Sequence, residues 1–530
     1  MPRPADRRVA HADTPEYLPP ATENFARLLS HAATAFADRP AMVLRDGHVT
    51  FDELGRRAAA VMAALAEAGV VAGDVVTVLV RDPDDAAAAY HAALGIGAIG
   101  INVNELYRPR QLEHVLEHAR ARVLVTSREL LASLPRPIRS PVPVLLIDDV
   151  ARDGGEFRPV ARSGADHAQV IYTSGSMGQP KGVLLSHANL WAGTRIVAGY
   201  LDVRPSDRIA SLLPFSFVYG FNQLNLALFA GATLVVERSP LAREIVATLR
   251  RERVTMLAAV PPLWLQLLGV GEFRERPIES LRVMTNAGGK LPTSATLALR
   301  AAQPHAALFL MYGLTEVFRS TYLPPQEVDR HPDSMGRAIP ESVVYVVDED
   351  GRLCPPGVVG ELAHGGPTVA LGYLHDPEAT ARVFRPNPFL APGQTAPDRI
   401  VFSGDMVRRD EHGLLYYVGR RDRLVKSLGY RVSPEEITDV LYASGEVREA
   451  VVLTEPDRTR GTRLVACVVL TPDGSLDRVR RFCGIELPRY MQPTRFEALE
   501  ELPRNASGKH DLVALHARLA LPAGSADDPS

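Results

Sequence analysis

Short apolar runs alternate with alanine-rich segments along the first half of this sequence. The run Val75–Val80 consists mostly of β-branched residues and indicates a buried strand, and the segment from about Asp85 to Leu94 is typical of a helix. Before them, Thr50-Phe51-Asp52-Glu53 has the form of a capping box that opens an earlier helix. Further strand candidates are Ala121–Thr126, Val144–Ile147, Ala232–Glu237, Val254–Ala259 and Leu281–Thr285. Strands that alternate with helices predict layered α/β structure.

The pattern changes at about Val343. From there, short strands are separated by turn residues such as Asp350-Gly351 and His412-Gly413. This pattern predicts a β-rich subdomain that ends near Gly419.

A second unit begins beyond Arg421. Ser433-Pro434-Glu435-Glu436 offers an N-cap, a proline at N1 and a glutamate at N3, which predicts a helix start. Strand candidates Ala450–Thr454 and Arg463–Leu470 follow. We therefore predict an α/β fold in which residues 1–421 form a large N-terminal domain, made of layered α/β subdomains and the β-rich subdomain. Residues 422–530 are predicted to form a small α+β C-terminal domain.

Composition excludes several classes of function. The formal net charge of -3 gives no basic surface for nucleic acid, and no apolar run approaches the roughly 18 residues of a membrane span. The N-terminal residues lack the apolar centre of a secretory signal. Cys354, Cys467 and Cys483 are far apart and form no CxxC pair, so we expect neither disulfides nor a thiolate metal site. Together these features predict a cytoplasmic protein.

The most informative stretch is Tyr172–Val183, with the sequence YTSGSMGQPKGV. Glycines let backbone N–H groups approach an anion closely, the hydroxyls add donors, and Lys181 adds a positive charge. Because the stretch follows the apolar run Val170–Tyr172, we expect a loop that holds phosphate groups. It is not a Walker A loop, since its spacing is G-x-x-G-x-x-K-G and no Gly-Lys-Ser/Thr occurs.

This stretch resembles the phosphate-binding signature of adenylate-forming enzymes, the superfamily of acyl-CoA synthetases, luciferase-like ligases and peptide-synthetase adenylation domains. The resemblance recurs in the family order along almost the whole chain and is strongest to acyl-CoA or acyl-carrier-protein ligases of biosynthetic clusters. The further matching segments are Asn286–Pro292, Tyr312–Glu316, Gly360–Leu362, Gly372-Tyr373, Ser403–Asp405, Gly419–Asp422, Lys426–Val432 and Pro503–Lys509.

The resemblance implies an ATP site assembled from these segments. The implied phosphate-binding residues are Thr173, Ser174, Gly175, Ser176, Gly178 and Lys181. The implied adenine-side residues are Gly288, Gly289, Lys290, Tyr312 and Gly313. By the same resemblance Asp405 and Arg420 would hold the ribose, Thr315 would serve the α-phosphate, and Glu316 would hold Mg²⁺.

The resemblance also implies a reaction in two steps. A carboxylate attacks the α-phosphate of ATP to give an acyl-adenylate, and a thiol of CoA or of a carrier protein's phosphopantetheine then takes the acyl group. Lys509 would be the main catalytic cation of the first step, on a C-terminal domain that rotates about Asp422. Gly429 would line the tunnel for the thiol. Met177 stands where many family members have threonine, which removes one hydroxyl from the phosphate loop.

The substrate is expected to be a small-molecule acid other than an ordinary α-amino acid. In amino-acid-activating relatives an aspartate pairs with the α-ammonium, and Val218, which follows Phe217, occupies that position here. A valine leaves a buried ammonium without a partner. Phe318 and Arg319 are expected to face the same pocket. Arg319 has two open interpretations, recognition of an extra anionic or polar group on the substrate and a structural salt bridge.

The acceptor is expected in trans, as CoA or a free-standing acyl carrier protein. Two alternatives stay open at this stage. An amine could capture the adenylate, with amide or diazo formation and even a small oxyacid such as nitrite as the activated species. A degenerate, non-catalytic ligase homologue is the other alternative, and the intact Lys509, Asp405, Arg420 and Glu316 argue against it.

Four further patterns are interpreted as structural. Gly95–Gly100 fits the dinucleotide-binding pattern G-x-G-x-x-G but follows a helix instead of a strand. His114–His118 fits H-x-x-E-H but has no obvious third ligand nearby, so a polar helix face is favoured. His187 is interpreted as a helix-start residue instead of a base. Pro332–Gly336 superficially resembles a carrier's phosphopantetheine site and is interpreted as a loop.

Overall fold

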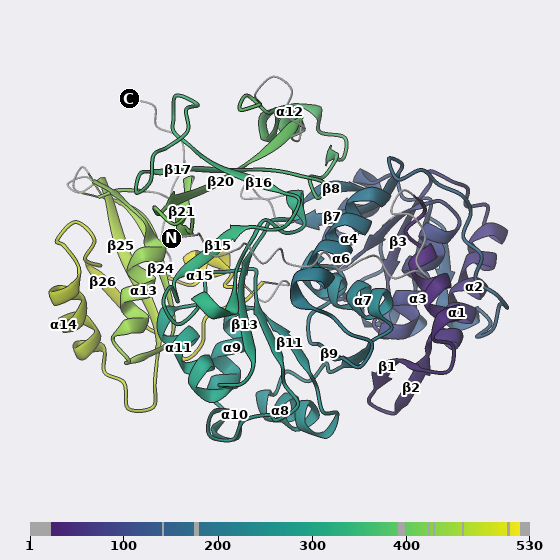
Figure 1. The fold of residues 1–530 in the computed structure, drawn as a ribbon, viewed down its shortest axis with the longest axis horizontal. Helices are drawn as coiled ribbons and strands as arrows, with labels where there is room; N and C mark the ends of the chain where they lie inside the picture. Colours follow the sequence, from purple (N-terminus) through teal and green to yellow (C-terminus); the bar gives the residue numbers. More distant parts are fainter. Residues whose placement is uncertain are drawn as a thin grey trace, which may run out of the picture.

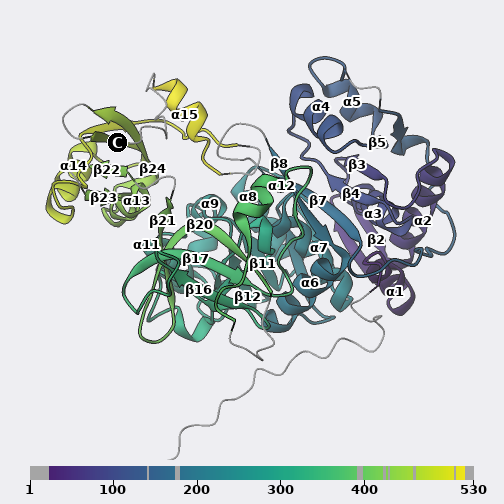
Figure 2. The same ribbon diagram turned by 90° about the horizontal axis from the view of Figure 1, so that it is seen from above.

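The described part of the protein contains three β-sheets with helices packed on them (Figure 1). The computed structural model describes residues 23–139, 142–173, 180–390, 398–421, 425–427, 430–457, 461–505 and 509–519. In these residues the sheets have fourteen, seven and five strands. Seen from above in Figure 2, the five-stranded sheet lies at one end and the strands β3 and β5 of the seven-stranded sheet lie at the other. The predicted α/β fold with a large N-terminal part and a smaller C-terminal part is confirmed.

The seven-stranded sheet has the order β18-β8-β7-β4-β3-β5-β6. Its strands are β3 (Val75–Leu79), β4 (Ile99–Asn102), β5 (Val123–Thr126), β6 (Val144–Leu146), β7 (His167–Thr173), β8 (Lys181–Ser186) and β18 (Gly372–Tyr373). The helices that connect its early strands, or precede them, are α2 (Phe51–Glu67), α3 (Pro83–Gly95), α4 (Pro109–His118) and α5 (Arg128–Ser133). Helix α3 is alanine-rich because it is buried all round from Asp85 to Gly95, where small side chains permit close packing. The predicted capping box at Thr50 and Glu53 forms at the start of α2.

The fourteen-stranded sheet has two halves of different character. In the first half, the parallel strands β10, β9, β11, β12 and β13 follow one another, with β1 parallel to β10. The strands of this half are β1 (Pro40–Leu44), β2 (Gly47–Thr50), β9 (Arg208–Ser211), β10 (Thr233–Val236), β11 (Met256–Ala259), β12 (Val283–Asn286), β13 (Ala307–Tyr312) and β14 (Thr321–Leu323). Every strand predicted in the first half of the sequence is therefore present in one of the two large sheets.

Two layers of helices cover this half of the sheet. Helices α1 (Arg27–Ala35), α6 (His187–Leu201) and α7 (Val218–Ala230) share one apolar core with strands of both large sheets, so α6 and α7 lie between the sheets (Figure 1). A second apolar core packs another set of helices against the opposite face of this half of the fourteen-stranded sheet. These helices are α8 (Ala242–Arg251), α9 (Pro261–Leu268), α10 (Gly271–Glu275) and α11 (Thr293–Ala302).

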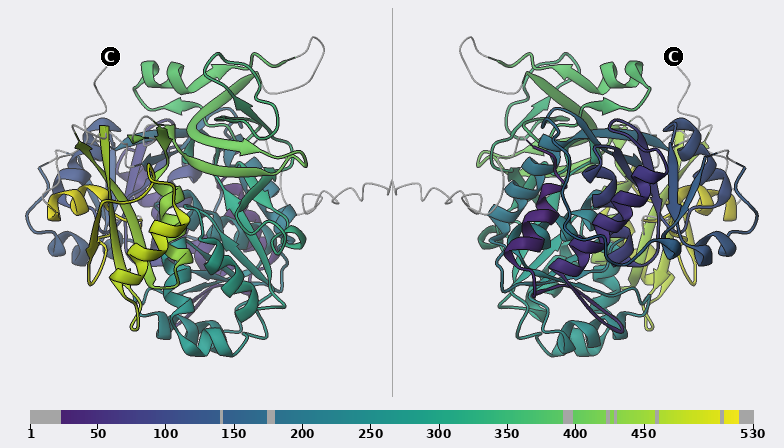
Figure 3. Two further views of the ribbon diagram at one scale, coloured as in Figure 1. Left: turned by 90° about the vertical axis from the view of Figure 1, so that its left-hand side faces the viewer. Right: turned by 90° about the vertical axis from the view of Figure 1, so that its right-hand side faces the viewer.

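The second half of the sheet is the predicted β-rich part, and its strand pairs are antiparallel. Its elements are β15 (Ser334–Ala338), β16 (Val343–Val347), β17 (Val359–Gly365), α12 (Pro377–Val383), β19 (Phe384–Pro386), β20 (Arg399–Arg409) and β21 (Leu415–Arg420). Figure 3 shows this part, in green, projecting above the layered parts. The predicted turns form at Gly351 and Gly413, whose φ angles of 80° and 82° favour glycine.

One interpretation of the sequence was wrong. The sequence interpretation predicts a loop at Pro332–Gly336, but Ser334 begins strand β15, which pairs with β14 and β21. The pairing has an irregular register between Ser334 and Gly336. A Cβ at Gly336 would lie 1.9 Å from the Tyr322 oxygen, so only glycine permits this approach of the strands. Long-range pairing partners decide such a strand, and local sequence does not display them.

The C-terminal part has its own core around the five-stranded sheet. Its elements are β22 (Val425–Ser427), β23 (Tyr430–Val432), α13 (Pro434–Ala443), β24 (Val447–Asp457), β25 (Gly461–Leu470), α14 (Leu476–Glu486), β26 (Arg495–Ala498) and α15 (Leu512–Arg518). Alternate residues of β25 face opposite ways: Ala466 belongs to the core with α13 and α14, and Cys467 to the core with α15. Ser433 caps α13 as predicted. The boundary predicted between residues 421 and 422 stays a prediction, because residues 422–424 lie outside the described residues.

Two expectations about membranes and cysteines can be compared with the structure. Among the helices of the described residues, none combines the length and the apolar character that a membrane span requires. The three cysteines are all buried and carry free thiols.

A buried ion pair joins α2 to α3. Arg57 Nε lies 2.7 Å from Asp85 Oδ1, and both side chains are 5% exposed. The remaining guanidinium nitrogens of Arg57 donate to the backbone oxygens of Ile147, Val150 and Ala151. This one side chain therefore satisfies acceptors from two separate segments.

We expect Arg57→Met to lower the free energy of unfolding of the N-terminal part by about 3–5 kcal/mol, because it leaves Asp85 and three backbone oxygens without this donor. Urea unfolding followed by circular dichroism measures the change. Arg56→Met is the matched control, since the neighbouring Arg56 pairs with Asp52 at the surface and is 46% exposed. Equal effects of the two substitutions would contradict the expectation.

Candidate functional site

The predicted phosphate loop connects two antiparallel strands. Thr173, the last residue of β7, pairs across the hairpin with Lys181, the first residue of β8. The loop between them includes Ser174, Gly175, Ser176, Met177 and Gly178, which lie outside the described residues. The hairpin holds the two ends of the predicted loop, Thr173 and Lys181, side by side.

Strand β18 brings Tyr373 to this hairpin. It pairs with β8, with Tyr373 opposite Val183. Lys181 Nζ lies 5.3 Å from the centre of the Tyr373 ring and 3.6 Å from Asp376 Oδ2. The Tyr373 hydroxyl donates to Glu316 Oε1 at 2.6 Å. Tyr373 thus joins the predicted phosphate-binding lysine to the predicted Mg²⁺ ligand.

Glu316 is held from its backbone as well as its side chain. It lies in the short 3₁₀ helix η2 (Thr315–Val317) that follows β13. Its backbone oxygen accepts from the Ala370 N–H at 2.8 Å. The hydrogen bond from Tyr373 uses Oε1, which leaves Oε2 available to a cation. Mg²⁺ usually takes one or two protein carboxylates together with substrate phosphates, so this donor set fits it.

Tyr312, Asp405 and Arg420 meet at the other side of the site. Asp405 and Arg420 are direct partners in the antiparallel pair β20 and β21, and Arg420 Nη1 lies 3.3 Å from Asp405 Oδ1. The Tyr312 hydroxyl donates to Asp405 Oδ2. Asp405 is 6% exposed, and its own N–H donates to Ser403 Oγ at 3.0 Å. The carboxylate is therefore fixed in direction by neighbours from both halves of the large sheet.

The two tyrosines of the site stay protonated at physiological pH. Burial raises the pKa of Tyr312 well above its usual range, and Asp405 raises it further. Burial also raises the pKa of Tyr373, and Glu316 adds to that rise while Arg420 opposes it. Both phenols thus act as hydrogen-bond donors. The influence of Arg420 on Tyr373 also places the two clusters within electrostatic reach of each other.

The predicted adenine-side loop and the Tyr312 segment share one edge of the sheet. Strands β12 and β13 are parallel neighbours, so Asn286 and Tyr312 both lie at carboxyl ends, where open α/β sheets bind ligands. Gly288 has a φ angle of 82°, and a Cβ there would lie 3.2 Å from Val260 Cγ1. Gly313 is similarly confined, since a Cβ would lie 3.0 Å from the Arg319 Cα atom.

Lys290 of the predicted adenine-side loop also contacts the C-terminal part. Its Nζ forms an ion pair with Asp439 of helix α13, in the C-terminal part. Burial raises the pKa of Asp439, and Lys290 opposes that rise. The Ser433 hydroxyl donates to the Val418 backbone oxygen at 2.6 Å. In this structure Lys290 therefore contributes to the contact between the two parts.

The residues predicted to line the acid pocket come from the start of α7 and from the segment after Glu316. Val218 begins α7 and is 9% exposed, and Phe217 is half-buried before it. Phe318 and Arg319 are 2% and 3% exposed. The Arg319 guanidinium carbon lies 5.0 Å from the centre of the ring of Tyr219, which directly follows Val218.

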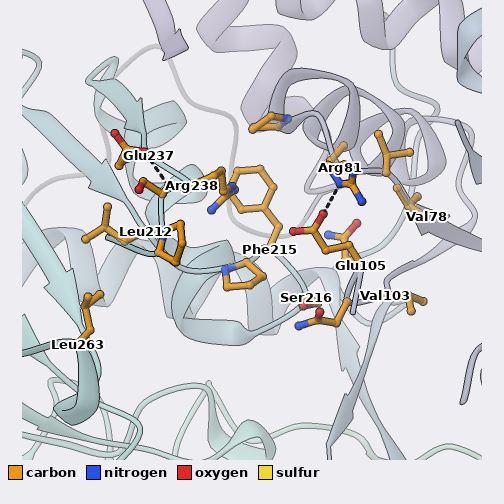
Figure 4. A pocket seen from close by; sticks show the side chains of 18 of the residues that line it. Val78, Arg81, Val103, Glu105, Leu212, Phe215, Ser216, Glu237, Arg238 and Leu263 are labelled. Carbon is orange, nitrogen blue, oxygen red and sulfur yellow. Dashed lines mark hydrogen bonds and ion pairs between the residues drawn. The ribbon is translucent and has the colours of Figure 1, made fainter. Parts of the chain in front are cut away.

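A cavity of about 240 Å³ lies between the seven-stranded and the fourteen-stranded sheets (Figure 4). The residues that border it include Phe215, Ser216, Arg81 and Glu105. Arg81 and Glu105 form an ion pair, with 2.9 Å between Nε and Oε2. A smaller pocket is lined by Ser216, Phe217 and Tyr172. Ser216 borders both spaces, so the cavity adjoins the segment that leads into the predicted acid pocket.

Lys509 lies on the C-terminal part and is exposed. Its backbone oxygen accepts from the Asn505 N–H at 2.8 Å, and its own N–H donates to Asn505 Oδ1 at 3.1 Å. Arg504, which directly precedes Asn505, donates to Glu449 Oε2 at 2.7 Å. These bonds anchor the base of the predicted lysine loop to β24. Asp422 and Gly429, the predicted hinge and tunnel residues, lie outside the described residues.

Three of the patterns interpreted as structural lie in helices or at their ends. Gly95 ends α3 and the following residues enter β4, which is the wrong order for a dinucleotide fingerprint. His114 Nε2 lies 3.2 Å from the Pro180 backbone oxygen, and His118 Nδ1 lies 2.8 Å from the Tyr172 hydroxyl. No cluster of three metal-ligating side chains occurs among the residues that the structure describes. His187 is the first residue of α6, capped by Ser186.

Sequence reasoning missed three residues of this arrangement. Tyr373 and Glu361 stand in segments that resemble family motifs but received no role. Glu361 accepts from the Gly404 N–H at 2.9 Å and from Arg421 Nη1 at 2.8 Å, so it supports the turn before Asp405. The motif match was a signal that could have identified both. Asp439 had no signal, because its partner Lys290 lies far away in the sequence.

Comparison with known proteins gives a consistent picture. The sequence model of the AMP-binding enzyme family matches residues 29–374, and that of the AMP-binding enzyme C-terminal domain matches residues 436–509. Gramicidin S synthase 2 from Brevibacillus brevis is 30% identical over 492 residues, which are 90% of this chain. The chain spans only 11% of the length of that relative.

Two solved structures show the likeness of fold. The anthranilate CoA ligase AuaEII, in complex with anthranoyl-AMP, superposes with a TM-score of 0.83 at 25% identity, over 95% of this chain and 98% of the ligase. The amide bond synthetase McbA from Marinactinospora thermotolerans superposes with a TM-score of 0.80 at 24% identity, over 93% of this chain and 99% of the synthetase. At that identity the second likeness concerns the fold alone.

We expect Lys290→Ala to weaken the contact between the two parts about 2–5-fold, since it leaves the half-buried Asp439 without its cation. Asp439→Asn should have a smaller effect, because burial already opposes the charge of that carboxylate. The rate of limited proteolysis between the parts measures the contact. Arg300→Ala is the control. Arg300 lies in helix α11 and pairs with Asp329, so its ion pair stays within the N-terminal part. A larger effect of Asp439→Asn than of Lys290→Ala would contradict this ranking.

Proposed function

Because this chain belongs to the family of AMP-binding enzymes and is an adenylate-forming enzyme, we propose that it activates a carboxylic acid as acyl-AMP and passes the acyl group to a thiol. The thiol is that of CoA or of a separate carrier protein's phosphopantetheine. The single observation that carries this proposal is that charged and hydroxyl side chains from separate segments of the chain contact one another in two clusters. The first cluster is Tyr312, Asp405 and Arg420, and the second is Glu316, Tyr373 and Lys181.

The chemistry explains why such a site is needed. A carboxylate is a poor acyl donor because oxide would have to leave. Its oxygen attacks the α-phosphorus of ATP, the bond to pyrophosphate breaks, and the mixed anhydride acyl-AMP forms. A thiolate then attacks the carbonyl carbon and AMP leaves. Negative charge builds up on phosphate and carboxylate oxygens, so positioned cations and N–H donors supply most of the stabilisation.

Each cluster has a part in this scheme. Asp405, held by Tyr312 and Arg420, has the fixed carboxylate that accepts from ribose hydroxyls. Glu316 would hold Mg²⁺ together with phosphate oxygens, and the metal would neutralise the departing pyrophosphate. Lys181 and Thr173, at the two ends of the hairpin loop, would bind phosphate oxygens, with Thr315 at the α-phosphate.

Lys509 would serve the first step from the C-terminal part. It would bridge the attacking carboxylate and the α-phosphate, and rotation of that part about Asp422 would then withdraw it and bring the Gly429 segment to the adenylate. The separate core of the C-terminal part supports such a motion, since the part can move without unfolding.

We expect Lys509→Ala to lower the rate of acid-dependent ATP–pyrophosphate exchange by roughly 100-fold or more, because it removes a cation aimed at the transition state. Thioester formation from chemically prepared acyl-AMP should stay within about 3-fold of the wild type. Arg489→Ala, which removes an exposed charge from the same part, serves as the control. Equal loss in both half-reactions would refute the division of labour.

The acid is proposed to lack an α-ammonium. Where an α-ammonium would lie in the proposed pocket, the first turn of α7 has the apolar Val218. A buried ammonium without a partner costs several kcal/mol, which corresponds to a loss of roughly 100-fold in kcat/KM. We expect 4-methylpentanoate to be favoured over leucine by about that factor in the exchange assay, and Val218→Asp to narrow the ratio. A wild-type preference for leucine would overturn this part of the proposal.

A second candidate differs only in the acceptor. An amine would attack the carbonyl carbon of the same acyl-adenylate, with AMP as the leaving group. Mass spectrometry of products formed with CoA, a phosphopantetheinylated carrier protein and a panel of amines separates the two. A non-catalytic homologue is disfavoured, because the sequence retains the charged residues that the proposed reaction needs, which are Lys509, Asp405, Arg420 and Glu316.

A further inference from the structure

Arg319 is a charged side chain in a place that is costly for charge. It follows Glu316 by three residues and is 3% exposed. Arginine is almost never buried to this degree unless it is paired. Its guanidinium lies against the ring of Tyr219, next to Val218 of the predicted acid pocket.

The charge of Arg319 has no carboxylate partner among the residues that the structure describes. None of the ion pairs in that part of the chain includes it, which disfavours the structural salt bridge as an interpretation. Its Nε and Nη2 atoms are buried and have no hydrogen-bond acceptor there. These two nitrogens form one edge of the guanidinium, and two parallel N–H groups along an edge match the two oxygens of a carboxylate.

The surroundings of Arg319 offer aromatic faces and neutral hydroxyls. Burial raises the pKa of Tyr200 and of Tyr219, and the positive charge of Arg319 opposes both rises. A contact of the Arg319 side chain with the neutral Tyr200 hydroxyl also opposes the rise for Tyr200. Both phenols remain neutral at physiological pH. The Tyr219 hydroxyl is engaged with Thr285, 2.7 Å from the backbone oxygen, and the Tyr200 ring stacks on Tyr322 with centres 4.4 Å apart. These groups orient the guanidinium without neutralising it.

The backbone holds Arg319 in this direction at a cost. Phe318 has a φ angle of 58°, a left-handed conformation that is strained for a bulky residue. Its ring packs on Gly193 of α6, where a Cβ would lie 2.5 Å from Phe318 Cδ1. Only glycine leaves room for the ring there. Strain of this kind concentrates at binding sites, where the surrounding structure fixes it.

We propose that Arg319 binds a second carboxylate of the acid, so that the substrate is a dicarboxylic acid activated at one end and held by Arg319 at the other. This inference rests on the proposed function and names the substrate class of the same pocket. A substrate carboxylate would supply the acceptor that the Nε and Nη2 edge lacks. An acid with an apolar tail would leave the guanidinium buried and unpaired.

The test compares acids that differ only in the second carboxylate. ATP–pyrophosphate exchange is measured for glutarate against pentanoate, adipate against hexanoate, and isophthalate against benzoate. For at least one pair we expect the diacid to have a kcat/KM roughly 100-fold higher or more, because a site built for hydrogen bonds discriminates strongly against a substrate that lacks them. A wild type that uses every monoacid at least as well as its diacid would overturn the inference and leave the proposed function standing.

Variants identify the residue responsible. Arg319→Met should abolish the preference mainly through a higher KM for the diacid, and Arg319→Lys should retain part of it. A variant that only lowers the thermal midpoint and keeps the preference would assign Arg319 a structural role and overturn the inference. If no acid supports exchange in the wild type, the proposed function fails. In that case, calorimetry with glutarate tests the subsite separately. Glutarate binding that Arg319→Met abolishes supports the subsite. Equal heats of binding for the wild type and the variant refute it.

Discussion

The register between β20 and β21 is the constraint on which the site depends. It sets Asp405 directly opposite Arg420, and the Tyr312 hydroxyl reaches the same carboxylate from β13. A shift of β21 by one residue would turn the Arg420 side chain to the other face of the sheet, away from Asp405. The large sheet continues from its parallel half into its antiparallel half through β14 and β15, so this register also fixes where the β-rich part stands over the parallel strands.

Burial determines how much each charged group of the site contributes. Exposed ion pairs contribute about 0–1 kcal/mol, whereas a buried charge without a partner costs several kcal/mol. Asp405 is buried with two strong donors, and Glu316 has the Tyr373 hydroxyl. Arg319 is buried against the Tyr219 ring and has no ion-pair partner among the described residues, and a cation over a ring gains only about 0.5–2 kcal/mol. Asp405 and Glu316 thus have strong protein partners, whereas the burial of the Arg319 charge is only partly compensated in that part of the chain.

Local signals in the sequence predicted most of the fold. The Thr50 capping box and the Ser433 cap formed because their hydrogen bonds join residues three apart. The run at Val75 was recognisable because its β-branched, apolar residue types suit a strand buried on both faces, between β4 and β5. Ser334 was misassigned because its strand exists only through β14 and β21. The ion pair of Lys290 with Asp439 had no local signal, because Asp439 comes from a helix that folds in the C-terminal part.

The sequence by itself determined the family, the order of the motifs and the chemistry that they serve, because these depend on residue type and spacing. The tertiary structure alone decided that Tyr373 links Lys181 to Glu316, and that Lys290 faces Asp439. Among the described residues it also shows no ion pair of Arg319, which disfavours the structural salt bridge, because a salt bridge depends on which carboxylates lie within reach. Such contacts join segments far apart in the chain, and their cost or benefit depends on burial, which no local pattern reveals.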